Sequence, residues 1–449
     1  MKFDVVVIGA GPGGEKCAQY LAKGGKKVCL MEKNESHIGG TCLNEGCIPA
    51  KLYLESVESL GRKKYLESLG LSMQDVSFDL ATLKEKKTAL LNQIRKGATD
   101  GVSKSGVEMV FGSATFVDEN SIKAGEQIIK ADKFVIATGS IHRPHPLLEI
   151  DKKQIISSDE VFELEKIPES ILIVGGGAIG CEFATFFNSI GVNVHIAEFT
   201  PNLVPAEDED VAKTLERELK RKGIKVTTNA NVTNYTKNEN SVMIDMQTPR
   251  GVVQGSYELV LVSIGRAPNT KNLGLENANI KSDRGFITVD KNLTTANPNI
   301  YALGDVIPTP ALAHMAYHEA RVVANNILHE KKMQASKVMP FVTFCHPQVA
   351  SVGLNEKSLK EQNIEYEVIK SFFKSSVKAK IKGDDGGFIK LLCDKDNGAI
   401  LGCAMIGNET TELIHEILIA INANLAKADL KEMIFAHPTL SESLWSMLQ

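Results

Sequence analysis

The chain has 449 residues, which exceeds one ordinary domain and predicts two to four. Its apolar content is ordinary for a globular protein, and its formal net charge of −4 is close to neutral. The absence of a basic tail or polybasic block argues against nucleic acid and an anionic membrane surface as partners. No apolar stretch is long enough to span a bilayer, so we expect no membrane-embedded part.

The N-terminal segment superficially imitates a signal peptide, with Lys2 followed by an apolar run at residues 5–8. That run is too short for the hydrophobic region of a signal peptide, and it leads directly into a glycine-rich turn. We therefore expect a first β-strand here, no cleaved leader and a cytoplasmic location.

The eight cysteines do not form the disulfide framework of a small secreted protein, because the chain is too long for one. Zinc-type spacing is also absent, so no metal site is expected. Six cysteines stand singly among apolar neighbours and are predicted to be buried: Cys17, Cys29, Cys181, Cys345, Cys393 and Cys403. The exception is the close pair Cys42 and Cys47.

An internal repeat is the strongest sign of how the chain is organised. Two copies of a G-x-G-x-x-G motif follow short apolar runs, at residues 5–8 and 171–174. The glycines are Gly9, Gly11 and Gly14 in the first copy and Gly175, Gly177 and Gly180 in the second. In each copy a second apolar run ends in an acid, Glu32 or Glu198, eighteen positions after the third glycine.

This arrangement is what a dinucleotide-binding βαβ unit requires. The first glycine permits a tight strand-to-helix turn, the second lets pyrophosphate approach bare backbone, and the third allows the helix to pack closely on the strand. The acid accepts hydrogen bonds from ribose hydroxyls. One such motif is a weak signal, but two copies with the acid in register predict two nucleotide-binding domains.

The second nucleotide site favours NAD over NADP. A 2′-phosphate would be repelled by Glu198 and would need a guanidinium nearby, whereas the first arginine after Glu198 is Arg217.

Cys42 and Cys47 lie in the segment G-G-T-C-L-N-E-G-C-I-P-A-K, residues 39–51. On a regular helix, residues i and i+5 are separated by about 7.5 Å along the axis, which exceeds the usual reach of a disulfide. A bond between them needs a distorted first turn, which Gly46 and Pro49 favour. Strained disulfides exchange readily, so we interpret the pair as a redox centre, with two unrelated buried thiols as the alternative.

Residues 39–51 resemble the redox-active segment of the class I flavin disulfide reductases, and among them that of the dihydrolipoamide dehydrogenases. The likeness covers essentially the whole chain. Four further segments carry it. Residues 137–139 resemble the crossover near FAD, and residues 265–269 resemble the end of the NAD domain. Residues 295–305 resemble the second FAD motif, and residues 437–442 resemble the catalytic His–Glu segment. Residues 346–353 resemble the start of the family's dimerisation domain.

The resemblance implies two doubly wound, Rossmann-like α/β domains followed by a C-terminal α+β dimerisation domain. The implied boundaries are 1–141 for the first part of the FAD domain, 142–269 for the NAD domain, 270–338 for the second part of the FAD domain, and 339–449 for dimerisation.

The resemblance also implies the site residues. The catalytic residues would be Cys42, Cys47, His437 and Glu442. Besides the glycines and Glu32, FAD would be held by Gly40, Thr41, Lys51, Ala114, Thr138, Gly139, Asp305, Ala313 and His314. Besides its own glycines and Glu198, NAD would be held by Glu182, Gly265 and Arg266. Glu182 would pair with Lys51, and His195, within a predicted strand, is interpreted as a packing residue.

The implied activity is oxidation of protein-bound dihydrolipoamide, with electrons passing through the Cys42–Cys47 disulfide and FAD to NAD⁺ and with no metal. The partners would be a second copy of the chain and a lipoyl-bearing protein of a 2-oxoacid dehydrogenase or glycine cleavage complex. Glutathione-type or mercuric-type reductases of the same family are alternatives, opposed by Glu198 and by the lack of a Cys pair after Cys403. A family flavoprotein without disulfide turnover is opposed by Cys42 and Cys47.

Three positions depart from the family pattern. Glu45 lies between the two cysteines where the family has an apolar or basic residue, Ala50 replaces a common serine, and Phe435 replaces a histidine. None removes a reacting group, but Glu45 is expected to raise the pKa of the thiols because it brings a like charge close to the thiolates.

Overall fold

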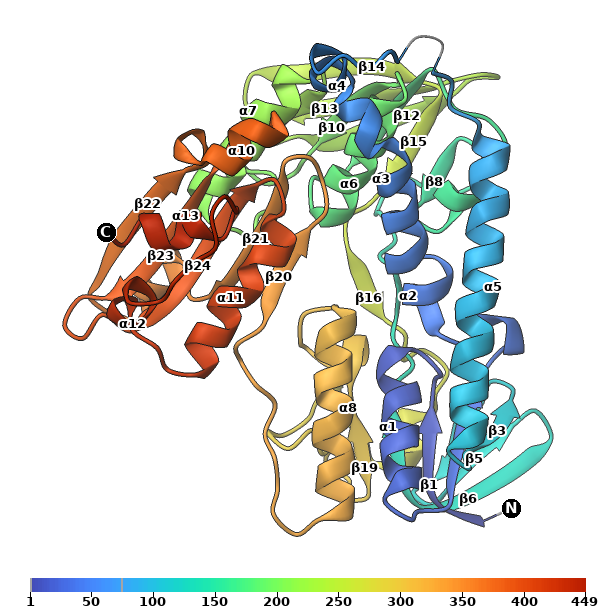
Figure 1. The fold of residues 1–449 in the computed structure, drawn as a ribbon. Helices are drawn as coiled ribbons and strands as arrows, with labels where there is room; N and C mark the ends of the chain where they lie inside the picture. Colours follow the sequence, from blue (N-terminus) through green and yellow to red (C-terminus); the bar gives the residue numbers. More distant parts are fainter. Residues whose placement is uncertain (1, 74–75) are drawn as a thin grey trace. The chain divides into compact units, whose positions relative to one another are not determined.

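The computed structural model of the chain describes residues 2–73 and 76–449. They form two compact units (Figure 1). Unit 1 comprises Met1–Pro49, Thr82–Arg143 and Arg266–Lys337, and unit 2 comprises Ala50–Ala81, Pro144–Gly265 and Val338–Gln449. Among the described residues, no helix is long and apolar enough to cross a membrane.

The chain passes between the units at residues 49/50, 81/82, 143/144, 265/266 and 337/338. Residues 50–81 therefore belong to unit 2. Packing explains this membership. Tyr53, on helix α3 (Cys47–Gly61), lies edge-on to Phe162 with ring centroids 5.1 Å apart, and its centroid is 5.2 Å from that of Phe186.

Unit 1 is built on a seven-stranded sheet with the strand order β3-β2-β1-β6-β5-β4, in which β19 also pairs with β6. The strands are β1 (Lys2–Ile8), β2 (Val28–Glu32), β3 (Glu108–Phe111), β4 (Ala114–Asp118), β5 (Ser121–Ala124), β6 (Gln127–Ile136) and β19 (Ile300–Ala302). The strands β3, β2, β1, β6 and β19 pair in parallel, while β4 and β5 form an antiparallel extension. A separate ribbon pairs β7 (Ser140–His142) with β16 (Arg266–Pro268).

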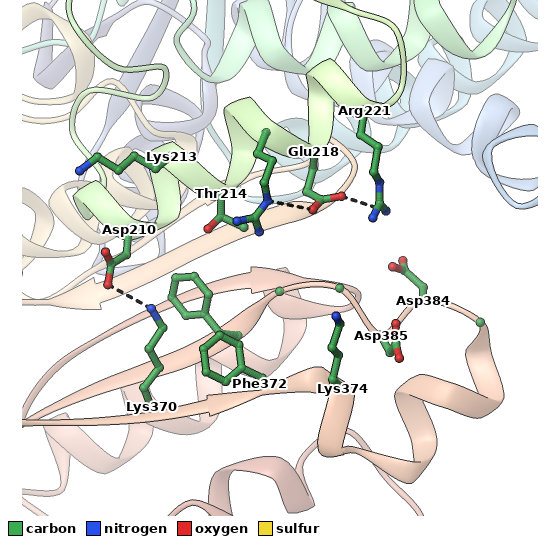
Figure 2. A pocket seen from close by; sticks show the side chains of 15 residues that line it. Asp210, Lys213, Thr214, Glu218, Arg221, Lys370, Phe372, Lys374, Asp384 and Asp385 are labelled. Carbon is green, nitrogen blue, oxygen red and sulfur yellow. Dashed lines mark hydrogen bonds and ion pairs between the residues drawn. The ribbon is translucent and has the colours of Figure 1, made fainter.

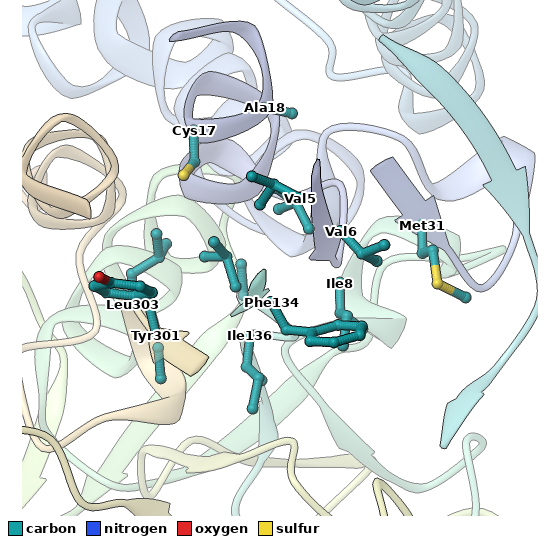
Figure 3. Packing of buried hydrophobic residues seen from close by; sticks show 14 of the residues in the cluster. Val5, Val6, Ile8, Cys17, Ala18, Met31, Phe134, Ile136, Tyr301 and Leu303 are labelled. Atoms are coloured by element: carbon teal, nitrogen blue, oxygen red, sulfur yellow. The ribbon is translucent and has the colours of Figure 1, made fainter. Parts of the chain in front are cut away.

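The core of unit 1 forms because the central strands are apolar on both faces, as parallel strands covered by helices must be. Residues 5–8 of β1 are all buried, and Figure 3 shows Val5, Val6 and Ile8 among Phe134 and Ile136 of β6. The helices of this unit are α1 (Pro12–Lys23), α2 (Gly40–Asn44), most of α5 (Leu80–Lys104) and α8 (Ala313–Leu328). Helix α1 packs against α8.

Unit 2 contains a second parallel sheet, with the order β11-β10-β9-β15-β8. Its strands are β8 (Ile155–Ser157), β9 (Ser170–Val174), β10 (Asn193–Ala197), β11 (Lys225–Thr227) and β15 (Leu259–Val262), with helices α6 (Ala178–Ser189) and α7 (Glu209–Arg221). A three-stranded antiparallel sheet joins β12 (Asn231–Lys237), β13 (Val242–Thr248) and β14 (Gly251–Tyr257).

The C-terminal part of unit 2 is an antiparallel sheet with the order β20-β21-β24-β23-β22, against which helix α11 packs. Its elements are β20 (Pro340–Thr343), β21 (Gln348–Gly353), α9 (Glu356–Glu361), β22 (Tyr366–Phe372), α10 (Val377–Lys382), β23 (Phe388–Asp394), β24 (Ile400–Gly407), α11 (Thr410–Asn422), α12 (Lys427–Lys431) and α13 (Glu442–Ser446). The predicted fold class is therefore confirmed, with two parallel α/β sheets followed by an α+β domain.

A buried ion cluster stabilises unit 2. Lys390 on β23 is 2% exposed, and its Nζ donates to Asp208 Oδ1 at 2.9 Å, to Asp210 Oδ2 at 3.2 Å and to Glu356. The hydrogen bonds and charges of these carboxylates raise the pKa of Lys390 above its ordinary value, despite the opposing effect of burial. Asp208 also caps α7, because its side chain accepts a hydrogen bond from the backbone N–H of Asp210.

Candidate active site

The first glycine motif has the geometry that a pyrophosphate needs. Gly9 has a φ of 105°, and a Cβ added at Gly14 would lie 1.9 Å from the carbonyl oxygen of Gly9. A Cβ at Gly11 would have its nearest contact at 3.9 Å, so bare backbone faces open space there. Glu32, buried at the end of β2, accepts a hydrogen bond from the backbone N–H of Ala10 at 2.8 Å. These residues fit the FAD that the first motif predicts.

The second motif repeats this geometry within unit 2. Gly175 has a φ of 111°, a Cβ at Gly180 would lie 2.0 Å from the Gly175 oxygen, and a Cβ at Gly177 would meet nothing within 4 Å. Buried Glu198 accepts from the backbone N–H of Gly176 at 2.6 Å and from that of Thr200 at 2.7 Å. The acid is thus fixed beside the glycine turn, where it fits an unphosphorylated ribose.

The redox segment is interrupted between its two cysteines, as the spacing of the pair requires. Helix α2 ends at Asn44 and helix α3 begins at Cys47. A Cβ at Gly46 would lie 2.8 Å from the Thr41 oxygen and 3.3 Å from the Cys42 Cα, so the chain folds back closely on Cys42 and requires glycine there. Cys42 and Cys47 are both half-buried, whereas the six cysteines predicted to be structural are all buried.

Three side chains that the sequence reasoning missed hold this segment. The Asn44 side-chain amide donates to the backbone oxygens of His37, Ile38 and Gly40, and its oxygen accepts from Arg95 Nη2 at 2.6 Å. His37 Nδ1 lies 3.4 Å from Glu45 Oε1. Because Arg95 stands 51 positions from Asn44, no local pattern could have indicated it.

The predicted pairing of Lys51 with Glu182 is confirmed within unit 2. Lys51 Nζ lies 3.0 Å from Glu182 Oε1 and 2.9 Å from Oε2, and it also stands 4.4 Å from the centroid of the Phe344 ring. The backbone N–H of Phe344 donates to Glu182 Oε1 at 2.9 Å, so the carboxylate is held from two sides.

Arg266, expected to hold NAD, contacts residues that are expected to hold FAD. It begins β16, which pairs with β7 in unit 1. Its Nε donates to the Ser140 hydroxyl at 2.7 Å, and its Nη2 lies 3.5 Å from the Thr41 hydroxyl. The same Ser140 hydroxyl donates to Asp305, which joins the predicted FAD residue to Arg266.

The remaining predicted FAD residues also lie in unit 1. Thr138 Oγ1 donates to the Asn269 oxygen at 2.8 Å, and the Asn269 N–H donates to the Gly139 oxygen at 2.9 Å. Ala114 begins β4, Ala313 begins α8, and His314 follows at the expected helix start. Gly40 has a φ of 60°. Gly265, predicted for NAD, is the last residue of its segment of unit 2.

His437 and Glu442 face each other in unit 2. The imidazole Nδ1 lies 3.0 Å from Glu442 Oε1, and the backbone N–H of Thr439 donates to Oε2 at 2.8 Å. The Thr439 N–H, followed by the hydrogen bond with His437, lowers the pKa of Glu442. The His437 side chain is 69% exposed, so the imidazole stands at the surface of unit 2. His195, in contrast, is buried and bonded to Tyr257 and Thr227, which confirms its packing role.

A pocket of about 780 Å³ in unit 2 lies between α7 and the strands β22 and β23 (Figure 2). Lysines and arginines alternate with carboxylates along it, and Glu218 lies between Arg217 and Arg221. None of the residues predicted for the site lines it.

Comparison with known proteins decides the family. Residues 3–320 match the family described as pyridine nucleotide-disulphide oxidoreductase, and residues 339–448 match the dimerisation domain of that family. The chain belongs to the pyridine nucleotide-disulphide oxidoreductases. It is therefore a flavoprotein disulfide oxidoreductase, and the predicted cofactors, FAD and NAD, are those of this family.

Two relatives and one solved structure show the extent of the likeness. A protein named dihydrolipoyl dehydrogenase from Chlamydia muridarum is 36% identical over 99% of this chain and 95% of its own length. Another of that name, from Geobacillus stearothermophilus, is 34% identical over 98% and 94%. The HOCl-induced flavoprotein disulfide reductase RclA from Escherichia coli has a TM-score of 0.89 at 28% identity, covering 99% of each chain. The matched dimerisation domain supports the expected homodimer in this oxidoreductase.

Proposed function

We propose that this oxidoreductase is a dihydrolipoamide dehydrogenase, which oxidises protein-bound dihydrolipoamide and reduces NAD⁺. The observation that carries the proposal is the His437–Glu442 pair, because oxidation of a dithiol needs a base that takes a thiol proton. The names of the full-length relatives support the same substrate.

In the proposed mechanism, His437 takes the proton of one dihydrolipoamide thiol at Nε2, while Glu442 fixes Nδ1 and stabilises the imidazolium. The thiolate attacks the Sγ of Cys42, the Cys42–Cys47 bond breaks, and Cys47 leaves as a thiolate. The second substrate thiol attacks the mixed disulfide at the substrate sulfur, and its proton passes to the Cys42 sulfur as Cys42 leaves. Oxidised lipoamide leaves, and Cys42 and Cys47 hold the two electrons.

FAD, when bound, supplies a two-electron carrier between the cysteine pair and NAD⁺. The residues proposed to hold it are the first glycine motif, Glu32, Thr41 and Asp305. Those proposed to hold NAD are the second glycine motif and Glu198. The Lys51–Glu182 pair is proposed to keep the Lys51 ammonium fixed near the flavin.

We further propose that each active site is shared between two chains, with His437 of one serving the cysteines of the other. The exposure of the His437 imidazole supports this arrangement, since a base that serves another chain must stand at a surface. The lipoyl-bearing partner would belong to a 2-oxoacid dehydrogenase or glycine cleavage complex, and the cytoplasmic location stays a prediction.

A reductase of another disulfide is the second candidate, since the E. coli structure is a disulfide reductase of a different name. Glutathione-type and mercuric-type reductases are usually NADPH enzymes, and the fixed carboxylate of Glu198 opposes the 2′-phosphate.

The test is a comparison of substrates with the FAD-loaded protein. We expect dihydrolipoamide with NAD⁺ to give the highest kcat/KM, at least about 100-fold above glutathione disulfide or mercuric ion with NADPH. His437→Gln should abolish most of the dihydrolipoamide turnover while FAD stays bound. A higher kcat/KM with glutathione disulfide or mercuric ion would contradict the proposal.

A further inference from the structure

A histidine–carboxylate pair joins the redox segment, residues 39–51, to the residue at position 37 just before it. The Nδ1 of His37 and the Oε1 of Glu45 are 3.4 Å apart, and the two side chains are 38% and 32% exposed. Glu45 stands three positions after Cys42 and two before Cys47. At this spacing its Cα lies within about 11 Å of the Cα of either cysteine, however the chain is folded.

The fold brings Glu45 closer than this limit requires. Its backbone N–H donates to the Thr41 oxygen at 2.9 Å, and the next residue, Gly46, packs against the Cys42 backbone. The carboxylate therefore belongs to the turn that joins the two cysteines. Over such distances, a negative charge opposes formation of a thiolate.

Three charged groups act on the His37 imidazole. Glu45, on the turn, raises the pKa of His37 through its hydrogen bond and its charge, and Glu32 on β2 also raises it. Burial and Arg95 on α5 lower it. Arginine keeps its charge at all ordinary pH values. The charge that changes near neutral pH in this part of the protein is therefore that of the His37 imidazole.

Two further titratable groups lie on neighbouring helices of unit 1, Tyr317 on α8 and Glu15 on α1. Burial raises the pKa of Tyr317, on α8, to about 12, so that its phenol stays neutral in the presence of the Cys42 and Cys47 thiols. Glu15, on α1, is bonded to Gln19 and paired with Lys16.

We propose that His37 is a positioning residue which, through Glu45, controls the negative charge beside the Cys42–Cys47 redox centre and makes the reactivity of its thiols depend on pH. With His37 protonated, the imidazolium offsets the Glu45 carboxylate and the thiolate forms more readily. When His37 loses its proton, the carboxylate is no longer offset, and thiolate formation becomes harder. The proposal rests on the proposed redox role of the cysteine pair, but not on which disulfide the enzyme exchanges.

The test measures the pKa of the more reactive of the two thiols directly. The FAD-loaded protein is reduced anaerobically with dithiothreitol and alkylated with iodoacetamide from pH 4 to 9, and mass spectrometry follows the peptide that carries Cys42 and Cys47. Four variants are compared with wild type: His37→Gln, Glu45→Gln, the double variant, and Glu35→Gln as a control. Glu35 is an exposed acid on the same short helix as His37.

We expect His37→Gln to raise the thiol pKa by about 0.5 pH unit or more and Glu45→Gln to lower it, while Glu35→Gln leaves it unchanged. The double variant should fall between the two single variants, and 0.5 M NaCl should reduce all the shifts. Equal pKa values in wild type, His37→Gln and Glu45→Gln would overturn the inference. If dihydrolipoamide turnover persisted in that case, the proposed function would stand while this inference failed.

Discussion

The Nδ1 of His437 is directed at the Glu442 carboxylate at 3.0 Å, which leaves Nε2 as the nitrogen that can accept a proton from a substrate thiol. Glu442 is itself fixed by the backbone N–H of Thr439, so the imidazole is held in one orientation. This relationship is local, since the two residues are five positions apart in sequence. The pair is therefore assembled before any partner binds.

Glu442→Gln should lower kcat for dihydrolipoamide oxidation by about 10- to 100-fold, because a charge-assisted hydrogen bond to the imidazolium is lost. The pH profile of kcat should also change, because the carboxylate that stabilises the charged imidazolium is lost. Steady-state rates from pH 5 to 9 measure both effects. Glu432→Gln, which removes an exposed acid ten positions before Glu442, serves as the control. An unchanged rate and pH profile in Glu442→Gln would show that Glu442 does not orient the His437 imidazole.

The enzyme should use NAD⁺ at least about 100-fold better than NADP⁺ in kcat/KM, because Glu198 would repel the 2′-phosphate. Glu198→Gln should reduce this ratio, chiefly by raising kcat/KM for NADP⁺. Comparable kcat/KM values for the two nucleotides in the wild-type enzyme would show that the cofactor assignment is wrong.

Lys390→Met should destabilise the protein by about 3 kcal/mol, since it leaves Asp208 as a buried carboxylate without its cation. Urea unfolding followed by circular dichroism measures the loss. Lys370→Met is the matched control, because Lys370 pairs with Asp210 at an exposed position and should cost less than about 1 kcal/mol. Equal effects of the two substitutions would argue against a structural role for the buried cluster.

Stability should also depend on Glu207. Burial raises the pKa of Glu207 to about 7, and its Oε2 has no hydrogen-bond partner within the described part of the chain. The pKa of Glu207 is thus higher in the folded protein than in the unfolded chain, so burial of this carboxyl group costs no stability below about pH 4.5. Stability is lost as the pH rises through about 7, because the buried group then ionises. Glu207→Gln should therefore raise the melting temperature by roughly 2 °C at pH 8 and leave it unchanged at pH 4.5. Glu209→Gln is the exposed control, and an equal gain at both pH values would contradict this account.

The sequence predicted those parts of the fold and site that depend on local spacing. The glycine motifs and their acids each lie within a short segment, and their spacing alone predicts a nucleotide-binding turn. The His437–Glu442 pair is also local, and it was indicated by its resemblance to the family's His–Glu segment. The position of Tyr53 against Phe162 and Phe186 was not predictable, since an apolar helix face does not specify which core it joins.

Long-range polar contacts were not predictable for a related reason. Lys390 lies in an apolar strand 182 positions from Asp208, and neither residue alone indicates a buried ion pair. Arg266 was assigned to NAD because it ends the NAD segment in the family pattern. It contacts Ser140 and Thr41, since the β7–β16 ribbon holds it in unit 1.

The most direct test of the proposed site is to mix two inactive variants, Cys42→Ser and His437→Gln, dissociate them together and let dimers re-form. One site of a mixed dimer would then carry both lesions, while the other would combine an intact cysteine pair with an intact His437 from the partner chain. Random reassortment makes half of the dimers mixed, so about a quarter of wild-type dihydrolipoamide turnover should return. No recovery, with mixed dimers shown by mass to be present, would contradict a shared site and place His437 with the cysteines of its own chain.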